Sequence, residues 1–218
     1  LSTAAAAIFV ISEQDIRRSG ATTIPDALRM VPGVNVAQID GNKWAVTARG
    51  ANGRFAAKLL VLMDGRTIYS PLFSGVFWDI QDINLESIER IEVIRGPGAT
   101  LWGANAVNGI INIITKSAAD THGGFVNAGL GSEGGNQAAF RYGAALSDKT
   151  DYRVFAKYHD RMGNQDLAGN PTADEWQSAR IGLRMDKRFS ASDSLMFITE
   201  AHDNTTGGTA FPTTLQPP

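Results

Sequence analysis

The sequence predicts a small α+β domain followed by a series of antiparallel β-strands. Helical and strand patterns alternate up to about Lys116, whereas only strand-length segments follow beyond about Gly123. Pairs of glycines beyond position 95 mark turns between those segments. We place the boundary at residues 117–122, so that residues 1–122 form the first domain and residues 123–218 the second.

Composition limits the classes of function. The 218 residues carry 20 basic and 22 acidic side chains, so no strong overall field attracts nucleic acid. Cysteine is absent, which excludes disulfide bonds and thiolate metal sites. No uncharged apolar run approaches the roughly 20 residues that a membrane-spanning helix requires, so contact with a bilayer has to be made by β-structure.

Two short helices are predicted near the N-terminus. Ser12 and Asp15 have the spacing of a capping box, and Gly20 ends the first helix. Thr23 caps the second helix, which has a proline in its first turn and ends at Pro32-Gly33.

Short strands make up the rest of the first domain and predict a small mixed β-sheet. The hairpin pair Asp64-Gly65 marks a turn, and residues 84–87 give a weak helical start. The predicted strands are residues 34–38, 44–48, 58–63, 91–94 and 109–116.

The second half consists of strands of about ten residues whose side chains alternate in polarity. In one of them, Arg153, Lys157 and His159 share a face that opposes apolar residues on the other. Strands of about nine to eleven residues, tilted by about 45°, cross a hydrocarbon layer in a closed barrel. A soluble antiparallel sheet with one wet face shows the same alternation, so the pattern alone leaves both open. The segments are residues 124–131, 138–146, 152–160, 177–189 and 194–202.

One long segment carries a family resemblance. Residues 88–109, Ile-Glu-Arg-Ile-Glu-Val-Ile-Arg-Gly-Pro-Gly-Ala-Thr-Leu-Trp-Gly-Ala-Asn-Ala-Val-Asn-Gly, and the following Ile-Ile-Asn-Ile-Ile-Thr-Lys resemble the signature of TonB-dependent receptor plug domains. Residues 26–34, 46–50 and 61–65 resemble three further plug motifs in family order. The resemblance covers residues 8–116, and the remainder resembles early barrel strands more loosely.

The resemblance implies a fold, a location and a function. The fold is an α+β plug domain followed by antiparallel β-strands of an incomplete transmembrane β-barrel. The location is the outer membrane of a Gram-negative bacterium. The implied function is to bind and import a scarce nutrient complex, with a ferric siderophore as the expected ligand and the plug gating the barrel. TonB is the implied partner, through a box that lies ahead of the plug and that nothing before Ile8 clearly matches.

The resemblance also assigns structural residues. Arg49 and Arg95, from two Arg-Gly motifs, are implied to latch the plug by pairing with glutamates on barrel strands beyond Pro218, and a guanidinium fork suits such pairs. Turn residues allow sharp bends or close packing against the wall. These residues are Gly50, Asp64, Gly65, Gly96, Gly103 and Gly109.

Ligand is expected to meet the apical loops of the plug at residues 51–55, 67–76 and 100–105. Their aromatic and basic side chains suit stacking on a flat ligand. Phe77 and Trp78 are instead expected in the plug core or against the barrel wall. The residues expected to face ligand are Arg54, Phe55, Tyr69, Phe73 and Trp102.

Signals for chemistry are missing from the sequence. His122, His159 and His202 are far apart and predict no metal site, and no motif predicts a cofactor or catalytic residues. We therefore expect no enzyme activity. Five strands cannot close a barrel that needs about 22 strands, so exposed edges predict self-association of this chain. The alternative function is a stand-alone soluble plug-like binding module of the periplasm, which a gene ending at Pro218 would favour.

Overall fold

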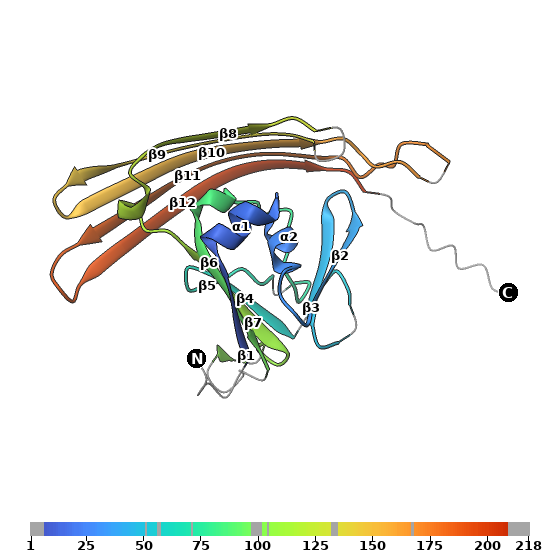
Figure 1. Ribbon diagram of the computed structural model, residues 1–218, viewed down its shortest axis with the longest axis horizontal. Coiled ribbons are helices and arrows are strands. Elements are labelled where there is room, and N and C mark those ends of the chain that lie inside the picture. The colour runs from blue at the N-terminus through green and yellow to red at the C-terminus, as the bar shows by residue number, and fades with distance from the viewer. Residues whose placement is uncertain are drawn as a thin grey trace.

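A computed structural model describes residues 7–50, 52–55, 58–70, 72–96, 102–103, 105–131, 135–166 and 168–208. Two five-stranded sheets and a two-stranded hairpin organise the chain. The second sheet arches over the first domain, as Figure 1 shows. Parts of all three predicted apical loops, residues 51, 71, 100, 101 and 104, lie outside the described residues.

The first domain begins with a strand and two helices and continues with six further strands. Its elements are β1 (Ala7–Ser12), α1 (Glu13–Ser19), α2 (Ile24–Leu28), β2 (Val34–Asp40), β3 (Lys43–Ala48), β4 (Leu59–Met63), β5 (Arg66–Thr67), the 3-10 helix η1 (Leu85–Ser87), β6 (Ile88–Arg95) and β7 (Gly109–Thr115). The second sheet follows the 3-10 helix η2 (Ala119–Thr121) and contains β8 (Gly123–Gly129), β9 (Asn136–Ser147), β10 (Thr150–Arg161), β11 (Trp176–Arg188) and β12 (Ser194–Thr206).

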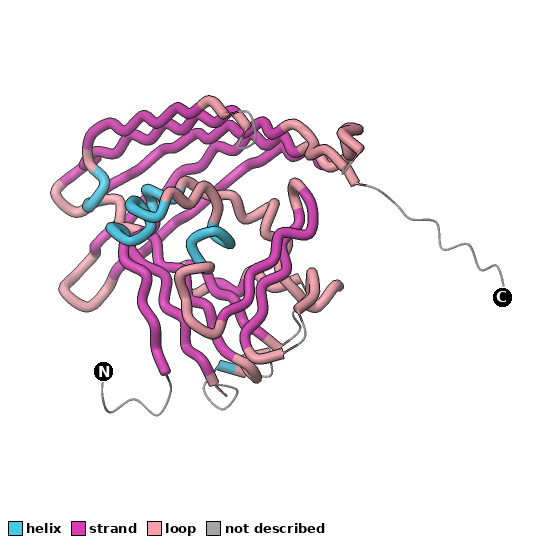
Figure 2. Tube along the Cα trace, turned by 45° about the vertical axis from the view of Figure 1, so that its right-hand side comes forward, coloured by secondary structure: helices cyan, strands magenta, loops and turns pink. Residues whose placement is uncertain are grey.

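The sheet of the first domain is mixed, which confirms the predicted fold class. Its strand order is β1-β6-β7-β4-β5, with β4 and β7 parallel and the other pairs antiparallel. The strands of this sheet lie side by side beneath the helices (Figure 2). The strand β1 was not predicted from the sequence; its residues 8–11 pair with β6. This apolar run of four residues lies directly before a helix cap and is too short for periodicity to identify it as a strand.

Both predicted helices are present, with the predicted caps. The Ser12 Oγ accepts from the Asp15 backbone N–H at 3.2 Å, the Asp15 carboxylate accepts from the Ser12 N–H at 2.9 Å, and Gly20 ends α1 with φ of 72°. Thr23 caps α2 by accepting from the Asp26 N–H. The second helix ends at Leu28, earlier than predicted, because the N–H groups from Met30 onward bond to carbonyls three residues back.

One hydrophobic core lies between the mixed sheet, the two helices and the β2–β3 hairpin. Ile16 of α1, Leu28 of α2 and Trp44 of β3 pack with sheet residues such as Ile91 and Ile111. All five are at most 5% exposed. Burying side chains of this size contributes roughly 1.5–3 kcal/mol each relative to the exposed state, so this core fixes the helices and the hairpin on the sheet.

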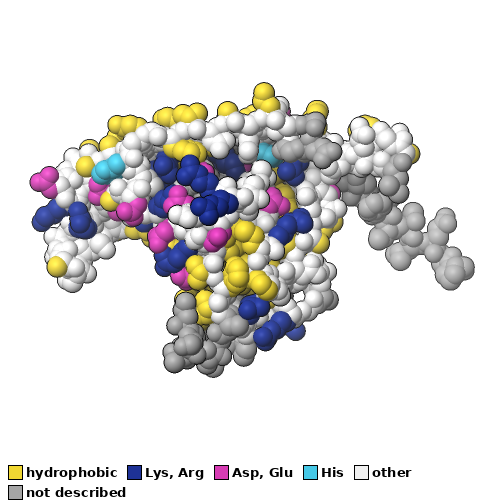
Figure 3. Space-filling view, viewed as in Figure 1, with side chains coloured by type: hydrophobic (Ala, Val, Ile, Leu, Met, Phe, Trp, Pro, Cys, Tyr) yellow, Lys and Arg dark blue, Asp and Glu magenta, His cyan; other side chains and the backbone are white. Residues whose placement is uncertain are grey.

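The second sheet is an antiparallel meander in the order β12-β11-β10-β9-β8. The predicted alternation is confirmed: Arg153, Lys157 and His159 are buried toward the first domain, whereas Val126 and Ile181 are 74% and 62% exposed on the outer face. Hydrophobic side chains accordingly gather along the outer rim of this sheet, and charged side chains gather between the sheet and the first domain (Figure 3). The sheet therefore has an apolar outer face and a polar inner face.

The core makes a direct stability prediction. Leu28 is fully buried, so Leu28→Ala leaves a cavity and should lower the free energy of unfolding by about 2–5 kcal/mol. Leu72→Ala is the matched control, because Leu72 is 81% exposed. Urea denaturation followed by tryptophan fluorescence measures both, and equal midpoints for the two variants would contradict this account of the core.

Candidate functional site

Two loops that are separated in sequence form an aromatic cluster. The ring of Phe55 stacks on Phe73 with centroids 5.4 Å apart, and Phe77 meets both edge-on at 5.2 and 5.3 Å. The guanidinium of Arg54 lies 5.2 Å from the Phe55 centroid and 5.6 Å from that of Phe77. A Cβ on Gly75 would lie 2.7 Å from the Phe55 Cα, so only glycine allows the loops to approach this closely. We call Arg54, Phe55, Phe73 and Phe77 the apical cluster.

Contacts of Asp79 place the apical cluster along the second sheet. The Asn204 side-chain amide, near the end of β12, donates to the Asp79 carbonyl at 3.4 Å. Burial raises the pKa of the Asp79 carboxyl, and the positive charge of nearby Arg54 partly opposes that shift. In transmembrane barrels, short turns face the periplasm and longer loops face the exterior. Asn204 lies at the end of the sheet that carries the long 162–175 connection, so the cluster lies toward the expected extracellular side.

The other residues expected to face ligand do not join the apical cluster. Tyr69 donates its backbone N–H to the Thr67 hydroxyl at 3.4 Å. Trp102 is 45% exposed and has no ring contact among the described residues. Trp78 is 6% exposed in the core, as expected, whereas Phe77 is half-buried and belongs to the cluster.

Arg49 and Arg95 form no ion pair with any described residue. Arg49 is exposed and adopts φ of 53°, whereas Arg95 donates from one terminal nitrogen to the Pro32 carbonyl at 2.6 Å. The Nε of Arg95 is buried without a partner. Pairing of these arginines with later barrel strands stays a prediction.

The predicted turn residues lie at bends or close approaches. Asp64 and Gly65 have φ of 48° and 77°, and their positive values suit the turn between β4 and β5. The Asp64 carboxylate also accepts from the backbone N–H and the hydroxyl of Thr115, both at 2.8 Å. A Cβ on Gly109 would lie 2.7 Å from the Ile94 carbonyl oxygen. The remaining three are Gly50, which is exposed, and Gly96 and Gly103, with φ of 131° and 93°.

The inner face of the second sheet holds the first domain through basic side chains. The Lys157 ammonium pairs with the Asp82 carboxylate at 2.6 Å, and both side chains are less than 10% exposed. Arg153 donates to the Lys116 carbonyl at 2.8 Å, and Arg184 donates to the Thr115 hydroxyl at 2.7 Å. We call the contributing residues the basic face; they are Arg141, Arg153, Lys157, Arg180 and Arg184.

The polarity of these contacts was not anticipated from sequence. The resemblance implied that arginines of the plug meet carboxylates of the wall, whereas in the described part the wall supplies most of the cations. All five residues in the basic face donate to backbone carbonyls, such as those of Ile80, Ile83 and Glu86. The charged face of the predicted strand at residues 152–160 was the sequence feature that could have indicated these contacts.

The tip of the β2–β3 hairpin is held under the 162–175 connection. The Asp174 carboxylate accepts from the Gly41 N–H at 2.6 Å and from the Asn164 N–H at 2.8 Å. The Asn42 side-chain amide donates to the Gly207 carbonyl at 2.9 Å. Burial raises the pKa of Asp174, but hydrogen bonds from Thr172, Asn164 and Gly41 together outweigh burial and leave the pKa below its ordinary value.

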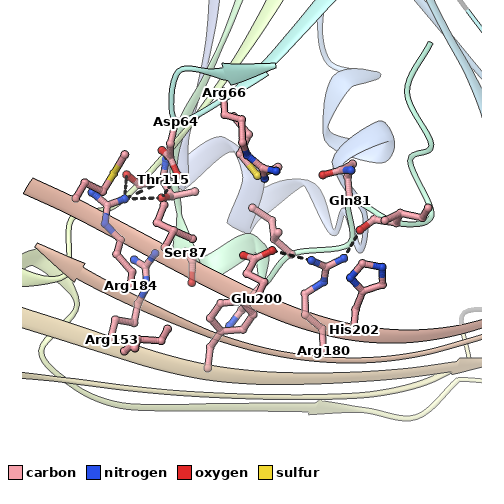
Figure 4. A pocket seen from close by; sticks show the side chains of 18 residues that line it. Asp64, Arg66, Gln81, Ser87, Thr115, Arg153, Arg180, Arg184, Glu200 and His202 are labelled. Carbon is pink, nitrogen blue, oxygen red and sulfur yellow. Dashed lines mark hydrogen bonds and ion pairs between the residues drawn. The ribbon is translucent and has the colours of Figure 1, made fainter. Parts of the chain in front are cut away.

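A cavity of about 500 Å³ lies between the first domain and the basic face. Figure 4 shows Asp64 and Arg66 on the side of the first domain, with Arg153, Arg180, Arg184 and Glu200 projecting from the second sheet. Two carboxylates in this lining are engaged, because Asp64 binds Thr115 and Glu200 binds Arg180 at 2.8 Å. The lining therefore carries more positive than negative charge.

Within the described residues, no group of three or more His, Cys, Asp or Glu side chains is placed to hold a metal ion. Among the same residues, none of the helices has the length and apolarity needed to cross a bilayer.

The fold and these contacts define a plug-like domain seated against the inner face of an outward-apolar antiparallel sheet. The profile of the TonB-dependent receptor plug domain matches residues 1–110. The chain therefore belongs to this family, whose members are receptors of the Gram-negative outer membrane.

Individual relatives agree with this assignment. The vitamin B12 transporter BtuB of Vibrio cholerae is 34% identical over 153 residues, covering 70% of this chain and 24% of the relative. The siderophore receptor PirA of Acinetobacter baumannii superposes with a TM-score of 0.69 at 23% identity, covering 91% of this chain and 32% of that one. The ferric yersiniabactin uptake receptor FyuA of Yersinia pestis gives 0.73 at 18% identity, with the same coverage. The chain thus spans about a quarter of the length of the curated relative.

The buried Lys157–Asp82 pair predicts coupled effects of substitution. Lys157→Met leaves the Asp82 carboxylate buried without a counter-charge and should lower the free energy of unfolding by about 3–5 kcal/mol. The double variant with Asp82→Asn should recover part of that loss. A double-mutant cycle by urea denaturation measures the coupling, with Lys149→Met, on an exposed turn, as control. Additive effects of the two substitutions would contradict the pair.

Asp174 predicts a pH-dependent contact between hairpin and loop. Its lowered pKa means that its stabilisation is present above the ordinary carboxyl pKa and is lost as pH falls through the lowered pKa. Asp174→Asn should therefore cost on the order of 2 kcal/mol at pH 7, with the difference from wild type shrinking below about pH 4. Unfolding curves from pH 7 to pH 3 measure it, with Asp148→Asn as control. A difference that does not change with pH would contradict the assignment.

Proposed function

We propose that the whole protein binds a scarce nutrient complex on its extracellular side and imports it across the outer membrane after TonB displaces the plug. The observation that carries the proposal is a plug domain held by hydrogen bonds and ion pairs against strands with an apolar outer face. Such contacts stabilise by about 0.5–1.5 kcal/mol each when water is the alternative partner, so a plug held by them can be displaced.

The apical cluster favours a ferric siderophore as ligand. Phe73 is 49% exposed, and it stacks on a ring that also carries the Arg54 guanidinium. An exposed aromatic face beside a fixed cation suits an anionic ligand with aromatic groups, as in metal complexes of catecholates. Trp102 and Tyr69 supply further aromatic surface in the proposed apical region.

Cobalamin is the second candidate, and the relatives favour it. The curated relatives at 34–37% identity are named as vitamin B12 transporters, whereas the siderophore receptors share the fold at lower identity. The region in which these relatives match this chain is the plug and the first strands. Most of the extracellular surface of the relatives lies outside that region.

The plug is proposed to be latched at Arg49 and Arg95 as well. The unpartnered, buried Nε of Arg95 and the exposed Arg49 side chain leave donors for carboxylates of further strands.

The soluble binding module is the less favoured alternative. Val126, Ile181 and Leu195 are between 48% and 74% exposed on the outer face, which suits lipid better than water. The same apolar face, together with the open edges of β8 and β12, leaves self-association of the 218-residue chain as a prediction.

Uptake measurements test the function and the ligand together. Cells that carry the full-length receptor as their sole importer are given ⁵⁵Fe-labelled catecholate siderophore or ⁵⁷Co-labelled cobalamin. We expect TonB-dependent iron uptake, and Phe73→Ala should weaken siderophore binding about tenfold through loss of the stacking surface. Phe189→Ala is the control, because Phe189 is equally exposed on the β11–β12 turn. Uptake of cobalamin alone would make cobalamin, and not the siderophore, the ligand. If cells with the wild-type or variant receptor take up neither compound, both candidate ligands are rejected.

A further inference from the structure

The cavity between plug and basic face contains buried donors without partners. The Asn84 Nδ2, the Ser87 Oγ, the Arg153 Nε and the Arg180 Nε are buried and form no hydrogen bond with any residue that the structure describes. All four residues line this cavity, and each is between 4% and 6% exposed. An unpaired buried donor costs roughly 1–3 kcal/mol, so four of them around one space indicate an acceptor that occupies it.

The charges in the lining indicate the nature of that acceptor. Four guanidinium groups and only two carboxylates line the cavity, and both carboxylates already accept hydrogen bonds from protein groups. Among the described residues, the Arg153 guanidinium has no carboxylate partner and donates only to the Lys116 carbonyl. The Arg66 side chain has no hydrogen bond or ion pair within the described part of the chain. Cations without counter-charges beside unpaired donors favour an anion with several acceptor oxygens.

We propose that this cavity is a binding subsite for an oxyanion, a phosphate or carboxylate group, held between Arg66 of the plug and Arg153 of the barrel wall. Ser87 and Asn84 supply neutral donors to the same group, and the planar guanidinium of Arg153 offers it a fixed fork. Arg180 already binds Glu200 and the Ile80 carbonyl, so its free Nε adds a weaker contact.

The position of the subsite gives it a role within the proposed function, on which this step rests. Arg153 and Arg184 lie near the ends of β10 and β11 that are joined by short turns, whereas the apical cluster lies toward the other end. Short turns face the periplasm in transmembrane barrels. The subsite is therefore deeper than the apical cluster and lies on the plug–wall boundary that opens when the plug moves. The oxyanion is either a group of the transported ligand or free periplasmic phosphate.

Calorimetric titration of the purified full-length receptor with inorganic phosphate, at constant ionic strength in chloride, tests the subsite. We expect one phosphate per receptor, with affinity reduced about tenfold in Arg66→Gln and several-fold in Ser87→Ala, since each loses a direct donor. Both substitutions leave the hydrogen bonds of the described residues in place, because neither side chain has a hydrogen-bonding partner among them. Arg17→Gln removes the same charge from the exposed side of α1 and should bind phosphate like wild type. Absence of phosphate binding in wild type, or equal affinity in Arg66→Gln and Arg17→Gln, would overturn the proposal.

A second measurement separates the two sources of the oxyanion. Binding of labelled ligand to de-energised cells reports the apical surface, and uptake in energised cells reports passage. Slower uptake in Arg66→Gln with unchanged surface binding assigns the subsite to a group of the ligand. Unchanged uptake together with weakened phosphate binding assigns it to free phosphate. Failure of wild-type cells to take up either ligand rejects the proposed transport function and leaves the phosphate titration valid.

Discussion

The structure depends on one constraint: a folded domain packs against the polar inner face of a sheet whose outer face is apolar. The basic face meets this constraint with long side chains that reach from the wall to backbone carbonyls of the plug, as Arg153 does at Lys116 and Lys157 at Ile83. Carbonyls at the end of β7 and around η1 accept these bonds. The wall therefore contributes to the hydrogen bonding of the plug backbone.

The alternation of the second sheet follows from the same constraint. Side chains on a strand point alternately to its two faces, so a strand that meets a polar plug on one side and lipid on the other has to change character at every residue. Val154 and Ala156 on one side of β10, and Arg153 and Lys157 on the other, show this pattern directly. The Lys157–Asp82 ion pair, whose side chains are both less than 10% exposed, joins the wall to the plug.

Local features could be predicted from the sequence, whereas contacts between distant segments could not. The Ser12–Asp15 cap and the Asp64-Gly65 turn are encoded within a few residues, and the structure has both. The charged face of β10 could be predicted. The groups of the plug that it contacts could not, because they are backbone carbonyls, which every residue type has. Asp174 meets Gly41 across 133 positions, and nothing in either local sequence identifies the other. The strand β1 was missed because its pairing with β6 identifies it as a strand more clearly than its own pattern of side chains does.

A polar boundary between plug and wall also suits the release of the plug that the proposed function requires. An apolar interface of similar extent would lose roughly 25 cal/mol for every Å² exposed when the plug moves, with no compensation from water. Hydrogen bonds lose much less, because water replaces the departing partner at each carbonyl and each guanidinium. A buried ion pair such as Lys157–Asp82 behaves similarly, because its separation exposes two charges that water then solvates well. Under the proposed function, a force applied to one end of the plug would therefore break these contacts one after another, and water would replace each lost partner.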